Sequence, residues 1–285
     1  MSKLKIAVQK SGRLSGKSLD LLRECGIKIS NSNQKLMTVS SNFPIEILFL
    51  RDDDIPQYVE QNVADIGILG ENEVWEKNRK VTTVRKLGFG NCRLSLAIPK
   101  EENYTDLTYF NHKKIATTYP NILRDFCTKK QLEVEIEEIG GSVEIAPGIG
   151  LANCIFDIVS TGSTLLMNGL KEVQTVAQSE AVLIKTPELS EEKQAILTQL
   201  LFRIQAVMYS KENKYILLNA PNNAVKQIIS LLPGMKSPTV LPLAEEGWSS
   251  IHSVIKEDKF WEIIDQLQDL GAQGILIIPI EKMIT

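Results

Sequence analysis

The sequence predicts an α/β protein with two lobes and a smaller C-terminal domain. Short apolar, β-branched runs alternate with amphipathic helical stretches up to about residue 210, which predicts sheets covered by helices on both faces. After a long helical stretch the order becomes strand, helix, two strands, helix and strand within roughly 75 residues, the order of a ferredoxin-like domain. The 285 residues, 43% of them hydrophobic, suffice for two or three cores.

Composition argues against several classes of protein. The net charge of -3 and the lack of a Lys/Arg block predict no nucleic-acid partner, and 6% aromatic residues are too few for base-stacking platforms. No apolar run approaches the ~20 residues of a membrane helix, and the N-terminus lacks the apolar core of a signal peptide. We therefore expect a soluble, cytoplasmic protein without membrane contact. The four scattered cysteines, without a Cys-x-x-Cys pair, indicate reduced thiols.

The first predicted unit is a strand over Leu4–Gln9, a basic loop, and a helix that stops at Gly26, a residue type common at helix C-termini. Lys10 and Arg13 lie in the loop, near the start of the helix. A strand, loop and helix in this order can face an anion. Two solvated cations on a turn are the alternative.

A second buried strand over Ile45–Leu50 runs into Arg51 and three aspartates. Carboxylates before a helix suit its dipole, and an Asp cap with Pro56 just inside explains the acidic run structurally. Arg51, at the strand end, is the better functional candidate. The strand that starts at Asp65 ends in a glycine turn, where Glu71 emerges at the edge at which ligands usually bind.

Gly88 and Gly90 precede a strand that carries Arg93, and they mark either a hinge between lobes or a bulge. The pattern of strand, loop and helix then repeats over residues 114–139. A second Gly/Ser loop follows and opens a short helix, with Glu144 in its first turn.

The most informative stretch runs from Ile155 to Thr164. Ile155–Val159 is a mostly apolar strand with Asp157 inside it, and five small residues, Ser160–Thr164, follow. The backbone N–H groups of such a loop converge on an anion, and hydroxyls add donors. A carboxylate just upstream can bind sugar hydroxyls. The pairing predicts a site for a phosphorylated sugar, and a surface turn beside a satisfied Asp is the alternative.

The rest of the chain is predicted as a strand region over 173–184, a connector helix over 190–210 and the C-terminal domain. A domain of this kind at the end of an enzyme is more often regulatory or assembling than catalytic. Its predicted strands are 215–219, 238–242, 249–255 and 274–279, and its predicted helices are 222–232 and 260–270.

His112 and His252 are the only histidines, so few residues are available for histidine-based acid/base catalysis. We expect both in surface or packing positions. No cluster of metal ligands is visible in the sequence. Cationic loops, a phosphate-binding loop and scattered carboxylates suit a reaction that needs orientation and charge stabilisation. Group transfer from a phosphorylated sugar fits, because expelling pyrophosphate requires positive charge and Mg²⁺ on the leaving group.

Motifs along nearly the whole chain resemble the long-form ATP phosphoribosyltransferase family, whose members catalyse the first step of histidine biosynthesis. Each motif alone is weak, but together, in order and at compatible spacing, they are specific. They are QKSGRL (9–14), RDDDIP (51–56), DIGILGEN (65–72), FGNCRLS (89–95), GSVEIAP (141–147), DIVSTGST (157–164), LLPGMKSPTVLPL (231–243) and IPIEKM (278–283).

The resemblance implies two front lobes similar to periplasmic binding proteins. Residues 1–92 with 180–210 would form the first lobe and connector helix, 93–179 the second lobe, and 211–285 the regulatory domain. It also implies that N1 of the adenine of ATP attacks C1′ of phosphoribosyl pyrophosphate, giving phosphoribosyl-ATP and pyrophosphate through an oxocarbenium-like displacement with Mg²⁺ as cofactor. Because N1 is a neutral lone pair, no strong base is required, which agrees with the scarcity of histidine.

The resemblance further implies the site residues. Catalytic roles fall to Lys10, Arg13, Arg51 and Glu144, with Glu144 also the expected Mg²⁺ ligand. Phosphoribosyl pyrophosphate would bind Asp157, Ser160, Thr161, Gly162, Ser163 and Thr164. ATP would bind Arg13, Glu71, Arg93 and Tyr119, although packing against Pro120 explains Tyr119 equally well. Histidine, as feedback inhibitor, would bind Asn219, Thr239 and Gly274.

The implied partners are ATP, phosphoribosyl pyrophosphate, histidine, AMP as a candidate inhibitor, and copies of the chain in a homo-hexamer with a dimeric form. The chain departs from the family pattern at Gly148, where a basic residue is expected, and at Asn153, which replaces an acidic residue before the strand of the phosphate loop. It also departs at Asn219, which replaces a more usual acidic residue or histidine. One rival interpretation is a two-lobed receptor or sensor without catalysis, but no export signal or DNA-binding motif supports it. The other is a short-form catalytic subunit, and the C-terminal domain argues against that.

Overall fold

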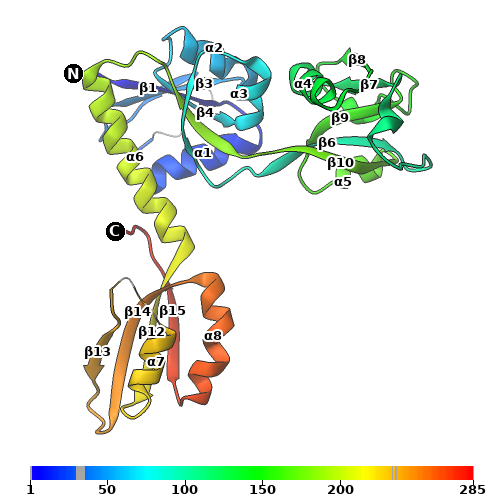
Figure 1. The fold of residues 1–285 in the computed structure, drawn as a ribbon. Helices are drawn as coiled ribbons and strands as arrows, with labels where there is room; N and C mark the ends of the chain where they lie inside the picture. The colour runs from blue at the N-terminus through cyan, green and yellow to red at the C-terminus, as the bar shows by residue number, and fades with distance from the viewer. Residues whose placement is uncertain (1, 30–35, 233, 235, 285) are drawn as a thin grey trace. The chain divides into compact units, whose positions relative to one another are not determined.

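The computed structural model describes residues 2–29, 36–232, 234 and 236–284 (Figure 1). They form two compact units, Met1–Arg23 with Ile27–Ile196 and Glu24–Gly26 with Leu197–Thr285. Met1 at the N-terminus, and Pro233 and Met235 of the 231–243 motif, lie outside the described residues. In the described part of the chain, no helix combines the length and apolar character needed to cross a bilayer.

The first unit contains two sheets, which together confirm the predicted α/β class. The first sheet has six strands in the spatial order β2 (Met37–Val39), β3 (Ile45–Leu50), β1 (Leu4–Gln9), β4 (Ile66–Gly70), β11 (Ala181–Lys185) and β5 (Thr82–Lys86). The helices α1 (Arg13–Glu24), α2 (Ile55–Glu60) and α3 (Glu71–Lys77) follow β1, β3 and β4. Because β1 runs parallel to β3 and β4, the loops after these strands gather at one edge.

The second sheet has the spatial order β10 (Leu170–Ser179), β6 (Cys92–Pro99), β9 (Cys154–Val159), β7 (Lys114–Thr117) and β8 (Glu135–Glu138). The helix α4 (Pro120–Lys130) follows β7, and the short helix α5 (Ser163–Met167) follows β9. Apolar side chains of β6, β9 and α4 form one core, which includes Leu94, Leu96, Phe156 and Leu123. This core fixes the strand that carries the predicted phosphate loop.

The chain leaves the first sheet after β5 and returns to it through β11, so two segments join the sheets. Gly88 and Gly90 lie in the first segment and both have φ +71. A Cβ on Gly90 would come within 2.3 Å of Leu14 Cδ2. The positive φ favours glycine at position 90, and a larger residue would also displace the Leu14 side chain of α1. The role of Gly90 as a hinge stays a prediction.

The C-terminal sheet has the order β13 (Thr239–Pro242), β14 (Trp248–Lys256), β12 (Asn213–Pro221) and β15 (Gln273–Pro279), with every pair antiparallel. The helices α7 (Val225–Leu231) and α8 (Glu257–Asp269) complete the predicted order of a ferredoxin-like domain. Alternate residues of β12, such as Ile216 and Leu218, pack against helical residues such as Ile228 and Leu267. The connector helix α6 (Glu191–Glu212) precedes this domain.

Several elements differ from the prediction. The strand region 173–184 consists of two strands, β10 and β11, in different sheets. The sequence interpretation missed β2, α3 and β5. Asp54 does stand at the N-cap of α2, with proline in the first turn, but its side chain makes no capping hydrogen bond. The acidic run therefore stabilises α2 through the helix dipole at most, and not through an Asp cap.

Candidate functional site

The predicted phosphate loop, Ser160–Thr164, joins the end of β9 to α5. Gly162 has φ +81, a left-handed conformation that glycine adopts without strain, and α5 begins at the next residue. The first N–H groups of a helix have no partner within it and are available to an acceptor. The hydroxyl oxygens of Thr161 and Ser163 lie 3.0 Å apart. Backbone and side-chain donors therefore gather at the end of this strand.

Two arginines hold the loop. Arg13, the first residue of α1, donates a hydrogen bond to the Ser160 hydroxyl. Arg93 on β6 donates from Nη1 to the Ser160 carbonyl at 3.0 Å. Its other guanidinium nitrogens bind Glu172 in a bidentate pair, with Nε–Oε1 2.6 Å and Nη2–Oε2 2.5 Å. That Arg93 binds ATP stays a prediction, since here its side chain braces the loop.

Asp157 on β9 shares a cavity with this loop. The cavity has a volume of about 400 Å³, and Arg13 and Glu144 also line it. Burial raises the pKa of Asp157 to about 6, and the nearby Glu144 carboxylate raises it further. The hydrogen bond from the Ile158 N–H to Oδ1 and the charge of Arg13 both lower this pKa. The carboxylate of Asp157 is therefore near both a cation and a second carboxylate, in the same cavity as the predicted phosphate loop.

Glu144 lies in a short 3₁₀ helix and is half-buried at this cavity. Among the described residues, no group of three or more His, Cys, Asp and Glu side chains could hold a metal ion unaided. Mg²⁺ in phosphate sites usually takes one or two carboxylates and completes its coordination with substrate phosphates and water. The pair Glu144 and Asp157 fits a Mg²⁺ that arrives with a polyphosphate.

Two further predicted cations follow parallel strands of the first sheet. Lys10 comes directly after β1, and its backbone N–H donates to the Leu50 carbonyl at 2.7 Å, which places the loops after β1 and β3 side by side. Arg51 follows β3; its side chain is 80% exposed, and Nε lies 3.3 Å from Asp53 Oδ1. Both cations thus stand at the edge where the strands end, Lys10 exposed and Arg51 loosely paired.

Gln9, the last residue of β1, was not among the predicted site residues. Its Nε2 donates to Asp52 at 3.0 Å, and its Oε1 accepts from the Leu14 N–H at 3.1 Å. Gly12 has φ +106, which favours glycine, and a Cβ there would lie 2.8 Å from Gln9 Nε2. The amide fixes the start of α1, which carries Arg13. The signal in the sequence was an amide at a strand end, directly before a basic glycine loop.

Glu71 lies at the start of α3 and is directed to its own sheet. Its Oε2 is 3.0 Å from Lys86 Nζ on β5, and only 14% of the side chain is exposed. Its backbone N–H donates to the Glu180 carbonyl at 2.9 Å. A role for Glu71 in ATP binding stays a prediction.

Asn72 and Glu73, the next residues of α3, are not among the predicted site residues, and they contact Tyr119. Asn72 Nδ2 lies 3.0 Å from Glu73 Oε1 and 3.4 Å from the Tyr119 hydroxyl. Glu73 is 6% exposed. Burial raises its pKa to about 7, and the nearby Asp52 contributes. Burial also raises the pKa of Tyr119, which packs against the core of the second sheet. An ATP contact at Tyr119 stays a prediction beside this packing role.

The three residues expected to bind histidine lie on different strands of the C-terminal sheet. Asn219 on β12 pairs with Ser250 on β14, and Thr239 on β13 pairs with His252 on β14. Gly274 on β15 has φ +59, and a Cβ there would lie 3.4 Å from Asn219 Nδ2. The sheet thus places Asn219 beside Gly274, while β14 separates both from Thr239. Their role in inhibition stays a prediction.

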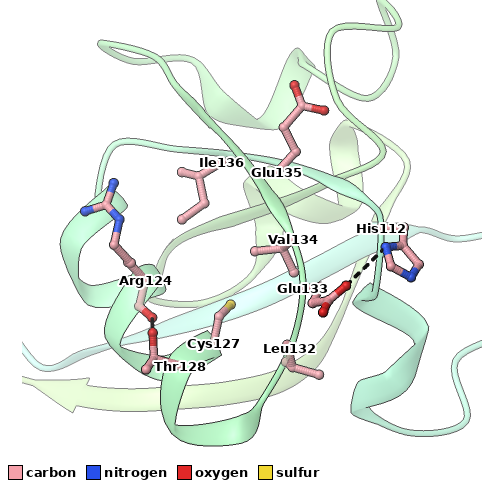
Figure 2. Close-up of a pocket in the computed structure, with 9 residues that line it drawn as sticks. All are labelled: His112, Arg124, Cys127, Thr128, Leu132, Glu133, Val134, Glu135 and Ile136. Carbon is pink, nitrogen blue, oxygen red and sulfur yellow. Dashed lines mark hydrogen bonds and ion pairs between the residues drawn. The ribbon is translucent and has the colours of Figure 1, made fainter.

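A second hollow, of about 750 Å³, lies between α4 and β8 (Figure 2). His112 in it is exposed, and its Nδ1 lies 3.8 Å from Glu133 Oε2. Among the described residues that line it, none belongs to the phosphate loop. The other histidine, His252, bonds through Nδ1 to the Tyr215 hydroxyl at 2.7 Å. The described contacts therefore place His112 at the surface and His252 in packing within the C-terminal sheet, and neither residue lines the Asp157 cavity. The residues that line this hollow are His112, Arg124, Cys127, Thr128, Leu132, Glu133, Val134, Glu135 and Ile136.

Comparison with known sequences identifies the family. The profile of the family described as ATP phosphoribosyltransferase matches residues 51–206, and that of the HisG C-terminal domain matches residues 210–282. The chain belongs to the ATP phosphoribosyltransferase family. It is 58% identical to the ATP phosphoribosyltransferase of Phocaeicola vulgatus over 281 residues, which is 99% of each chain. It is 56% identical to that of Cytophaga hutchinsonii, over 99% of this chain and 98% of the relative.

Because the C-terminal profile is present, the chain is a long-form member of the ATP phosphoribosyltransferase family, as predicted. The family is one of pentosyltransferase enzymes. A solved structure, the ATP phosphoribosyl transferase (HisG:HisZ) complex from Thermotoga maritima, matches with a TM-score of 0.60 and 28% identity, covering 71% of this chain and 98% of that one. The substrate-binding protein of an amino acid ABC transporter matches at 0.51 with 11% identity, covering 74% and 95%, which confirms the two-lobed fold alone.

Proposed function

We propose that this chain transfers the phosphoribosyl group of phosphoribosyl pyrophosphate to N1 of the adenine of ATP, as the first step of histidine biosynthesis. Membership of the family supports the reaction. The observation that carries the proposal is the cavity that holds Asp157, Glu144, Arg13 and the loop Ser160–Thr164 together. A sugar phosphate needs this combination of a phosphate-binding loop and a nearby carboxylate.

In the proposed reaction the N1 lone pair of adenine forms a bond to C1′ of the ribose. The bond from C1′ to the pyrophosphate oxygen breaks, and its electron pair leaves with pyrophosphate. The loop Ser160–Thr164 holds the 5′-phosphate, and Asp157 accepts hydrogen bonds from the ribose hydroxyls. Since N1 carries no proton, the site needs no strong base. The product is phosphoribosyl-ATP.

Positive charge stabilises the departing pyrophosphate. Arg13 lines the cavity of the loop, while Lys10 and Arg51 stand at the edge of the first sheet. Glu144, with Asp157 beside it, is the proposed holder of Mg²⁺, which neutralises the polyphosphate when bound. ATP is proposed to contact Arg13, Glu71, Arg93 and Tyr119.

The C-terminal domain is proposed to bind histidine as a feedback inhibitor, through Asn219, Thr239 and Gly274. Because Asn219 stands where the family more often has an acidic residue or histidine, we expect altered affinity. We propose a cytoplasmic homo-hexamer with a dimeric form, and AMP as a further inhibitor. The Thermotoga maritima relative is described as a HisG:HisZ complex, whereas this chain carries its own C-terminal domain.

The test is to incubate the full chain with ATP, phosphoribosyl pyrophosphate and Mg²⁺ and to identify the products by mass spectrometry. We expect equal amounts of phosphoribosyl-ATP and pyrophosphate, and neither when one substrate is omitted. Binding of phosphoribosyl pyrophosphate without release of pyrophosphate would contradict the proposal and favour a two-lobed receptor.

A further inference from the structure

The N-terminus of α4 is capped by a side chain from another helix of the same unit. The N-cap residue is Tyr119, whose side chain makes no capping hydrogen bond. The donors that a cap normally satisfies are instead bound by Glu76 of α3: its Oε1 accepts from the Asn121 N–H and its Oε2 from the Ile122 N–H, both at 3.0 Å. The carboxylate also suits the positive end of the helix dipole.

The contact is reciprocal, and Glu76 itself is buried. Asn121 Nδ2 donates to the Glu76 backbone carbonyl at 3.0 Å, and Glu76 is 4% exposed. A buried carboxylate held by two N–H groups is a directional link that is costly to break. Since α3 follows the first sheet and α4 belongs to the second, the link joins the two sheets at a point where the chain itself does not connect them.

The same two helices carry Tyr119 and its partner. Asn72, one turn before Glu76 on α3, reaches the Tyr119 hydroxyl. Tyr119 directly precedes the capped turn of α4, so a cap from α3 sets where its ring stands relative to α3. Moving the turn by about 1 Å would displace the ring from any substrate it contacts, and such shifts cost up to about 100-fold in rate.

We propose that Glu76 is a positioning residue, which locks α4 to α3 and thereby holds Tyr119 at the substrate site. The kinetic part of this inference rests on the proposed function, in which Tyr119 contacts ATP. The link that Glu76 makes between α3 and α4 does not depend on the proposed function.

Trp75 gives a readout that is independent of activity. It lines a hollow together with Asn121, Ile122 and Phe126, and is 38% exposed. In the full chain with Trp248→Phe and Trp261→Phe, the remaining tryptophan reports on the contact between α3 and α4. Glu76→Ala should raise quenching of Trp75 by acrylamide. It should also lower kcat/KM for ATP by about 10- to 100-fold, while KM for phosphoribosyl pyrophosphate changes less.

Glu60→Ala is the matched control. Glu60 also binds a backbone N–H, that of Lys80 at 2.9 Å, and pairs with Arg79, but all three lie in the first sheet's own loops and helices. Its loss should leave Trp75 quenching and the ATP kinetics unchanged. Should Glu76→Ala fail to fold, Glu76→Gln keeps the shape and one acceptor, and a smaller shift in the same direction is expected.

Unchanged quenching in folded Glu76→Ala would overturn the lock between the helices. Raised quenching with unchanged kcat/KM for ATP would overturn the positioning role. If the unsubstituted chain shows no transfer, the proposed function fails, and the quenching comparison still decides whether Glu76 joins α3 to α4.

Discussion

At the scale of single residues, Asp157 determines the chemistry of the cavity. It was predicted because a carboxylate interrupts an apolar strand just before a loop of small residues. The structure adds that it shares its cavity with Arg13 and Glu144. Neither neighbour is near Asp157 in the sequence, so the spacing of residues could not show that the three meet.

Asp157→Asn should lower kcat/KM for phosphoribosyl pyrophosphate. The loss of transition-state stabilisation should be roughly 1–3 kcal/mol, the scale of a hydrogen bond to a charged group. The amide can still accept one hydrogen bond, but the charge that attracts ribose hydroxyls is lost. Steady-state kinetics at saturating ATP measure the effect. Asp125 is an exposed carboxylate on α4, and Asp125→Asn serves as the control. An unchanged kcat/KM in Asp157→Asn would count against its ribose role.

Glu73 carries a testable pH dependence. Its pKa is about 7 in the folded protein and about 4.5 in the unfolded chain, mainly because it is buried. Folding therefore favours the protonated form, and the free energy of unfolding should fall as pH rises from about 4.5 to 7. Glu73→Gln removes this loss, so the variant should be more stable than the original chain at pH 8, by at most about 3 kcal/mol.

Urea denaturation at pH 4.5 and pH 8 measures the Glu73 effect. The two proteins should differ less at pH 4.5, where Glu73 is protonated in the folded state. A constant difference across this range would show that Glu73 ionises normally and that burial does not govern its pKa.

At the scale of elements, the phosphate loop depends on the conformation of one glycine. Gly162 has φ +81, so Gly162→Ala places a Cβ in a left-handed conformation that costs about 1 kcal/mol. We expect this loss in the free energy of unfolding, together with a higher KM for phosphoribosyl pyrophosphate. Gly148→Ala is the control, because Gly148 is exposed and a Cβ there makes only ordinary contact, 3.5 Å from Ile145 O. Equal effects of the two substitutions would contradict the requirement for glycine at position 162.

Elements with a clear apolar pattern were predictable, whereas β2, α3 and β5 were not. The strands Leu4–Gln9 and Ile45–Leu50 have the bounds predicted from their apolar runs. The helix α3 was missed because it is short and directly follows a strand, and β5 because Thr82–Lys86 has little apolar pattern. The omission of α3 mattered because α3 carries residues that contact α4. The omission of β5 mattered because β5 carries Lys86, the partner of Glu71.

Side-chain contacts between residues far apart in the sequence could not be predicted either. Arg93 was predicted to bind ATP, but the bidentate pair with Glu172 joins residues far apart in the sequence. Glu71 likewise pairs with Lys86, on a strand that was not predicted. Such contacts depend on strand order and register, which local patterns do not contain.

At the scale of the whole molecule, we propose that the first unit carries out the transfer and that the C-terminal domain controls it. Thr239→Ala should reduce inhibition by histidine several-fold, because a hydroxyl that hydrogen-bonds the bound histidine contributes about 1 kcal/mol to binding. Turnover without histidine should be unchanged. Thr239→Ser, which keeps the hydroxyl, should retain inhibition. Inhibition that is equal in Thr239→Ala and the original chain would remove this residue from the proposed site.

The proposed transfer and its control are tested most directly by pyrophosphate release from the full chain, measured with ATP, phosphoribosyl pyrophosphate and Mg²⁺ at increasing histidine concentration. We expect release of pyrophosphate to require both substrates and to fall as the histidine concentration rises. Absence of release when both substrates are bound would contradict the assignment of the Asp157 cavity. Release that is insensitive to histidine would contradict the role proposed for the C-terminal domain.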